Sequence, residues 1–254
     1  MLATLLTDQV FAFALVFVRL GAALMLLPTV GESAVPARIR LLFALSFTLV
    51  LTPLLAGRLP APPDGALELA MVVVGEVVIG LFIGAGARIV MSALHVAGMV
   101  FSFHSGLAAA QMFDPNQSVQ TSISGNFLNL LALMVIFVTD LHHLLLAGLV
   151  DSYAAFPAGS PWPAADHAEA LAHLVGDTFR VGLQIAAPVL VAGFLLYLGA
   201  GLLNRLMPQM MVFFVVLPVQ MVLAFGILMV SLSAALAWFT SYFDDTWLAL
   251  TVPG

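Results

Sequence analysis

Residues 206–243, LMPQMMVFFVVLPVQMVLAFGILMVSLSAALAWFTSYF, run for 38 residues without an acidic or basic side chain. At about 1.5 Å per residue, a helix of this length would measure roughly 57 Å, whereas the hydrocarbon core of a bilayer is about 30 Å thick. The run is therefore too long for one simple span. Pro208 and Pro218 lie inside it, and they predict either a steeply tilted, bent helix or a re-entrant hairpin.

The composition of the whole chain also indicates a membrane protein. Charged residues make up 8% of the 254 residues and hydrophobic residues 63%, whereas an ordinary soluble domain has roughly 25% charged residues. We therefore predict an all-α, polytopic membrane protein that forms a single integral membrane domain over residues 1–254. At about 20 residues a span, the chain has room for roughly six or seven spans. Asp8 and Arg19 near the start favour a retained first span over a cleaved secretory signal.

The other candidate spans are apolar runs with few or no charges. They comprise residues 10–30, 41–57, 67–94, 89–113, 115–139 and 181–204. Residues 58–65 and 156–163 read as polar connections, because proline and glycine recur in them. Residues 102–125 carry many serine, threonine and glutamine side chains and are too polar to face lipid.

Three charged residues interrupt the apolar runs: Arg19, Glu76 and Arg88. Because an ionised group at the bilayer centre costs about 2.5–3.5 kcal/mol or more, each should face protein or water and have a partner. One hypothesis is structural pairing within or between subunits. The other is a transport site at Glu76 and Arg88. We favour pairing, because one glutamate with two arginines is a sparse set for a proton path.

Gly80 and Gly84 form a G-x-x-x-G pattern beside Glu76. Small residues at this spacing let two helix backbones approach closely in a membrane. We therefore predict a helix-packing face at these glycines.

Catalytic and metal-binding signatures are weak. The chain lacks H-E-x-x-H, G-x-S-x-G and phosphate-loop motifs, and it has no cysteine. Asp140, His142 and His143 have metal-ligand types, but adjacent side chains on a helix point about 100° apart. We read them as a polar cluster at a helix end and expect no enzyme activity, metal or cofactor. The net charge of −6 without a basic cluster argues against nucleic-acid binding.

Several short segments, taken in order and spacing, resemble the FliR family of flagellar export-gate proteins and its counterpart in virulence type III secretion. The segments are Val35-Pro36-Ala-Arg38, Gly75-Glu76-Val-Val-Ile-Gly80-Leu-Phe-Ile-Gly84, Gly106-Leu107 with Asp114-Pro115, Phe127-Leu-Asn-Leu-Leu-Ala132, His142-His143-Leu-Leu, Asp151-Ser-Tyr with Phe156-Pro157, and Leu203-Asn204-Arg205-Leu-Met-Pro208-Gln209. One departure is His104-Ser105-Gly106-Leu107, where relatives commonly carry Gln-Met-Gly-Leu.

The resemblance implies long, kinked helical hairpins in one subunit of a helical, hetero-oligomeric pore in the bacterial inner membrane at the flagellar basal body. The implied partners are FliP, FliQ and FlhB-like subunits and unfolded flagellar export substrates. Residues 106–122 correspond to the loop that closes the pore in this family. The implied plug residues are Gly106, Gln111, Met112, Phe113, Asp114, Pro115 and Asn116.

The resemblance also gives the charged residues a role. It implies that Arg19, Glu76, Arg88 and Arg205 hold helices and neighbouring subunits in register, with partners on other polypeptides. A virulence secretion subunit and a self-sufficient secondary transporter are the alternative functions.

Overall fold

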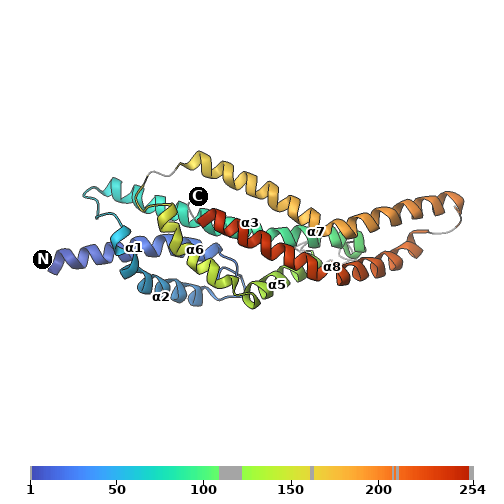
Figure 1. Ribbon diagram of the computed structural model, residues 1–254, viewed down its shortest axis with the longest axis horizontal. Helices are drawn as coiled ribbons and strands as arrows, with labels where there is room; N and C mark the ends of the chain where they lie inside the picture. The colour runs from blue at the N-terminus through green and yellow to red at the C-terminus, as the bar shows by residue number, and fades with distance from the viewer. Residues whose placement is uncertain (1, 109–121, 161–162, 208, 210–211, 252–254) are drawn as a thin grey trace. The chain divides into compact units, whose positions relative to one another are not determined.

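The structure, a computed structural model, describes residues 2–108, 122–160, 163–207, 209 and 212–251. These residues form helices joined by turns and loops, without a strand, so the all-α prediction is confirmed. The elements are α1 (Leu2–Leu26), α2 (Ala37–Leu55), the short 3-10 helix η1 (Ala56–Arg58), α3 (Ala66–Ser105), α5 (Ile123–Val138), α6 (Leu141–Ala155), α7 (Ala164–Leu206) and α8 (Val212–Thr251) (Figure 1).

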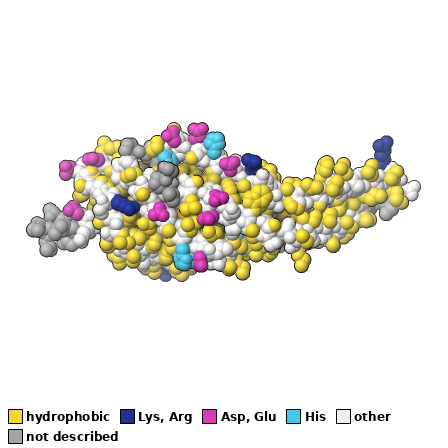
Figure 2. All heavy atoms as spheres, viewed as in Figure 1, with side chains coloured by type: hydrophobic (Ala, Val, Ile, Leu, Met, Phe, Trp, Pro, Cys, Tyr) yellow, Lys and Arg dark blue, Asp and Glu magenta, His cyan; other side chains and the backbone are white. Residues whose placement is uncertain are grey.

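Five of the described helices are long and apolar enough to cross a membrane, or six spans result if the bent pair α5 and α6 counts as one. The chain is therefore a polytopic membrane protein, and the count of six lies at the lower end of the six or seven spans for which its length has room. Apolar side chains cover most of the surface that is in view in Figure 2. Such a surface suits contact with lipid or with other apolar protein surfaces.

Helix α3 corrects the division that we made between residues 67–94 and 89–113. One continuous helix of 40 residues covers Ala66–Ser105, and Arg88 lies exposed in its middle. A single charge interrupts a hydropathy profile, but it does not break the backbone hydrogen bonds of the helix. In a helix, each N–H bonds to the carbonyl oxygen four residues earlier. Charge gaps alone therefore misplaced a boundary inside this helix.

Helix α8 answers the length problem of residues 206–243. It begins at Val212, contains Pro218 and continues through Asp244 and Asp245 to Thr251, so residues 212–243 do not form a re-entrant hairpin. A proline removes one backbone hydrogen bond, and a helix can continue through it with a kink. With 40 residues, α8 has about twice the length that a span requires.

The described residues group into two compact units. Unit 1 comprises Met1–Val90, Ile136–Val175 and Phe243–Gly254, and unit 2 comprises Met91–Val135 and Gly176–Tyr242. Helices α3, α7 and α8 each contribute residues to both units.

Unit 1 has a core in which one face of α1 is buried. The buried apolar residues of α1 fall into three groups that lie three to five positions apart, as one face of a helix requires. They are Leu15, Val16, Leu20, Ala23 and Leu24. At the end of α8, the buried Trp247 donates a hydrogen bond from Nε1 to the backbone oxygen of Leu144 at 3.0 Å. Gly148 on α6 makes room for this indole, because a Cβ there would lie 2.8 Å from Trp247 Cε2.

Unit 2 has a core where α3, α7 and α8 meet. Phe101, Val189 and Ala224 pack together there, and the Phe101 and Phe225 rings meet edge to face at 5.2 Å. Helix α5 approaches α3 closely at Gly98, where an added Cβ would lie 2.7 Å from the backbone oxygen of Ser124. The close approach therefore depends on the missing side chain.

Replacing Gly98 by alanine tests this contact. We expect Gly98→Ala to lower the free energy of unfolding in detergent by about 1–3 kcal/mol, because the methyl group would force the two backbones apart. Gly226→Ala on α8 is the matched control, since a Cβ there meets no described atom within 4 Å and alanine favours helix. Thermal unfolding of both purified variants measures the difference, and equal stability would contradict the packing role of Gly98.

Candidate functional site

A buried ion pair joins α1 to α3 in unit 1. Arg19 donates from Nε to Glu76 Oε2 and from Nη2 to Glu76 Oε1, the latter at 3.0 Å. The two side chains are 0% and 1% exposed. Two parallel N–H···O bonds between a guanidinium and a carboxylate form the strong, directional arrangement of such pairs.

Arg19 also contacts α6. Its Nη1 donates to the backbone oxygen of Ser152 at 3.3 Å, and its guanidinium carbon lies 4.0 Å from the centre of the Tyr153 ring. A cation above an aromatic face is attracted by the negative charge of that face. One arginine thus connects three helices.

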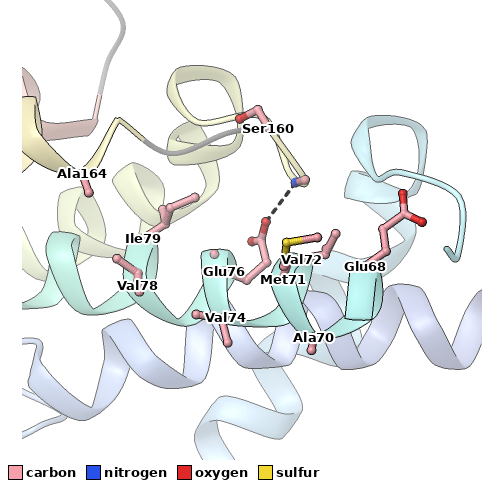
Figure 3. A pocket seen from close by; sticks show the side chains of 12 residues that line it. Glu68, Ala70, Met71, Val72, Val74, Glu76, Val78, Ile79, Ser160 and Ala164 are labelled. Carbon is pink, nitrogen blue, oxygen red and sulfur yellow. Dashed lines mark hydrogen bonds between the residues drawn. The ribbon is translucent and has the colours of Figure 1, made fainter. Parts of the chain in front are cut away.

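Glu76 faces a cavity on the other side of the pair. Its Oε1 accepts a long hydrogen bond of 3.4 Å from the backbone N–H of Gly159, in the connection between α6 and α7 (Figure 3). The cavity, of about 680 Å³, is lined mainly by apolar residues of α3, together with Ser160 and Ala164. The Glu76 carboxylate therefore accepts hydrogen bonds from Arg19 on α1 and from the connection between α6 and α7.

Two glycines allow α3 to come this close to α1. A Cβ on Gly80 would lie 2.9 Å from the Ala22 Cβ, and one on Gly84 would lie 2.7 Å from the backbone oxygen of Ala23. Both distances are too short for real atoms, so only glycine fits. The predicted packing residues lie at this crossing, one helical turn and two turns beyond Glu76.

Of the predicted plug residues, the structure describes only Gly106; Gln111, Met112, Phe113, Asp114, Pro115 and Asn116 lie outside the described residues. Gly106 follows the last residue of α3 with a φ of +78°, a conformation that favours glycine. A Cβ there would lie 3.3 Å from Leu217 Cδ2 of α8. This glycine therefore ends α3 in unit 2.

Three serines join the residues on either side of segment 109–121. The Ser102 hydroxyl lies 2.7 Å from that of Ser122 and 2.8 Å from that of Ser124. Ser122 precedes α5, and its Oγ accepts from the backbone N–H of Gly125 at 3.0 Å, as a helix N-cap does. This cluster was not predicted, although the polar character of residues 102–125 was a signal for it.

A second polar group lies among α3, α7 and α8 of unit 2. Gln220 donates from Nε2 to Tyr197 Oη at 3.0 Å, and the His104 and Tyr197 rings lie 6.2 Å apart, edge to face. Gly193 leaves room for the His104 ring. No sequence motif pointed to this group, because Gln220 lies alone in an apolar run.

The comparisons with known proteins identify the family. The family model of the bacterial export proteins, family 1, matches residues 10–246. The chain belongs to this family. It is 39% identical to the flagellar biosynthetic protein FliR of Caulobacter vibrioides, over 92% of this chain and 94% of that protein.

Relatives in other bacteria are also similar over most of their length. FliR of Bacillus subtilis is 29% identical, over 87% of this chain and 86% of the relative. Yop proteins translocation protein T of Yersinia pestis is 27% identical, over 88% of this chain and 87% of the relative. The resemblance that the sequence motifs predicted is thus confirmed.

For this member of the bacterial export proteins, the ion pair corrects one expectation. We predicted that Arg19 and Glu76 have partners on other polypeptides, but the two residues pair with each other inside one chain. They are 57 positions apart in the sequence, so their proximity follows from how α1 and α3 pack. The pair therefore requires no second subunit for its charge balance.

Arg88 and Arg205 behave differently from Arg19. Both are exposed, on α3 and α7, and neither makes a salt bridge in the part of the chain that the structure describes. Their role at subunit contacts stays a prediction.

Replacing Glu76 tests the ion pair. We expect Glu76→Ala to lower the free energy of unfolding by about 3–5 kcal/mol, because Arg19 would stay buried without its counter-charge. The double variant Arg19→Met, Glu76→Leu should recover much of this loss, since it leaves no charge unpaired. Denaturation in detergent measures both, with the exposed Arg88→Gln as a control that we expect to unfold like the parent. A Glu76→Ala protein of parental stability would contradict the structural role.

Proposed function

We propose that this chain is a non-enzymatic subunit of the flagellar type III protein export gate. Together with FliP and FliQ it forms the channel through which unfolded flagellar subunits leave the cell, with an FlhB-like subunit alongside. It acts in the bacterial inner membrane at the flagellar basal body, and flagellum assembly requires it. The family match over residues 10–246 is the observation that carries this proposal.

The surface of unit 2 supports a role as part of a larger assembly. Large apolar side chains on α7 and α8 are exposed in the isolated chain. They include Val191, Phe194, Leu195, Leu198, Leu202, Val219, Val222, Met229 and Val230. In a membrane these residues face lipid or the helices of other subunits, where close packing drives association.

The geometry of α3 does not favour the alternative function, a self-sufficient secondary transporter with a site at Glu76 and Arg88. That hypothesis placed Glu76 and Arg88 together, but they are 12 residues apart on one helix, or about 18 Å along its axis. Glu76 is engaged by Arg19 through both carboxylate oxygens, whereas Arg88 is exposed. The geometry of α3 thus favours a structural role for Glu76.

A virulence secretion system is the second candidate, because Yop proteins translocation protein T is also a relative. The flagellar role is favoured by the higher identity to FliR of Caulobacter vibrioides, 39% against 27%. Deleting the gene separates the two. Loss of swimming with normal secretion of virulence proteins supports the flagellar gate, and the opposite result supports the alternative.

Native mass spectrometry tests the proposed assembly. We expect the protein, extracted with detergent after co-expression with its FliP and FliQ counterparts, to occur as one copy in a hetero-oligomer. Expression without these partners should leave it as a smaller species. A protein that stays alone in both cases, and that transports a small solute in vesicles without companions, would overturn the proposal.

Deleting residues 108–118 tests the plug assignment. We expect assembled gates with this deletion to conduct ions in planar bilayers while closed parental gates do not, because the chain that obstructs the pore is gone. A deletion of residues 61–64, in the connection before α3, is the control and should leave the gate closed. Unchanged conductance in assembled gates with the first deletion would refute the assignment.

A further inference from the structure

Asp140, His142 and His143 lie together where the chain breaks between α5 and α6. Helix α5 ends at Val138 and α6 begins at Leu141. Asp140 is in the left-handed conformation, with a φ of +59°, and precedes the first turn of α6. All three residues belong to unit 1.

The three side chains bring potential metal-ligand atoms close together. One carboxylate oxygen and one ring nitrogen from each histidine all lie within 4.8 Å of one another. Within this set, His143 Nδ1 lies 3.8 Å from Asp140 Oδ1. Such a set of two imidazoles and one carboxylate is typical of sites for zinc and neighbouring transition metals.

The side chains of His142 and His143 do not diverge, although adjacent positions on a helix point in different directions. The two ring centres are 4.1 Å apart, and the ring planes are inclined by 37°. Cβ directions differ by about 100° between neighbours, but each imidazole extends beyond its Cβ and turns about two side-chain bonds. The side-chain rotamers of His142 and His143 therefore bring the two rings together, and the spacing of the two residues in the sequence cannot predict these rotamers.

A second observation concerns His142 itself. Its Nδ1 is shielded from solvent and has no hydrogen-bond partner among the residues that the structure describes, and the Phe137 ring lies beside it at a centroid distance of 5.2 Å. A shielded polar atom without a partner is costly. Coordination at this nitrogen would supply the partner that it lacks.

We propose that Asp140, His142 and His143 bind a divalent transition-metal ion of the Zn²⁺ class, with water completing the coordination. Bond lengths of about 2.0–2.2 Å place tetrahedral ligand atoms roughly 3.3 Å apart, so the cluster must contract. The side chains of Asp140 and His143 are 77% and 72% exposed and are free to rotate inward. A bound metal ion would link Asp140, which precedes α6, to the first turn of α6.

Isothermal titration of the purified, tag-free protein in detergent with ZnCl₂ tests the site. We expect one equivalent of Zn²⁺ to bind in the micromolar range or more tightly, whereas MgCl₂ should give no saturable binding, because Mg²⁺ prefers oxygen ligands. Asp140→Asn and His143→Ala should each weaken Zn²⁺ binding at least tenfold. Both replaced side chains are exposed, so the metal-free variants should unfold like the parent.

His173→Ala is the matched control. His173 is an exposed histidine on α7 that lies 3.7 Å from Glu169, but it belongs to no group of three ligands in the described residues. Its replacement should leave the Zn²⁺ affinity unchanged. Absence of saturable Zn²⁺ binding to the parent protein, or equal affinity in the Asp140→Asn and His143→Ala variants, would overturn the proposal. Neither outcome bears on the export-gate role, which the co-expression experiment tests separately.

Discussion

The buried pair of Arg19 and Glu76 is the constraint on which unit 1 depends. Neither charge could be moved from water into an apolar interior alone, because the desolvation cost would be several kcal/mol for each. Glu76 meets Arg19 through two hydrogen bonds, and Arg19 also reaches the backbone of Ser152 and the ring of Tyr153. These contacts specify which faces of α1, α3 and α6 meet. Gly80 and Gly84 make the arrangement possible, since a larger residue would hold α3 away from α1.

Unit 2 is held together by neutral polar contacts and apolar packing. The hydroxyl groups of Ser102, Ser122 and Ser124 join the end of α3 to the start of α5, and Gln220 bonds Tyr197 between α8 and α7. A neutral hydrogen bond contributes about 1 kcal/mol, considerably less than the cost of breaking a buried ion pair. Removing one partner of a hydrogen bond beside segment 109–121 should therefore cost less than removing one partner of the Arg19–Glu76 pair.

The division between buried and exposed charge also bears on assembly. Arg19 and Glu76 neutralise each other within the chain, so the proposed subunit contacts would involve exposed groups such as Arg88 and Arg205 and the exposed apolar faces of α7 and α8. In a membrane, association depends on close packing and on interhelical polar contacts, because lipid is as apolar as the helices themselves. The chain therefore has its own buried ion pair and an apolar surface that is suited to contact with lipid and with the proposed partner subunits.

The sequence by itself determined the membrane class, the helical content, the family and the need of Arg19 and Glu76 for partners, because composition and motifs are local properties of the chain. It also predicted a helix-packing face at Gly80 and Gly84, through their spacing beside Glu76. Only the tertiary structure decided that Arg19 and Glu76 are each other's partners, that Ser102 meets Ser122, and that the rings of His142 and His143 converge. Hydropathy misplaced a boundary at Arg88, since a helix propagates through backbone hydrogen bonds that a charged side chain does not break. Which distant residues meet depends on helix crossings and rotamers, and these arise only when the helices pack.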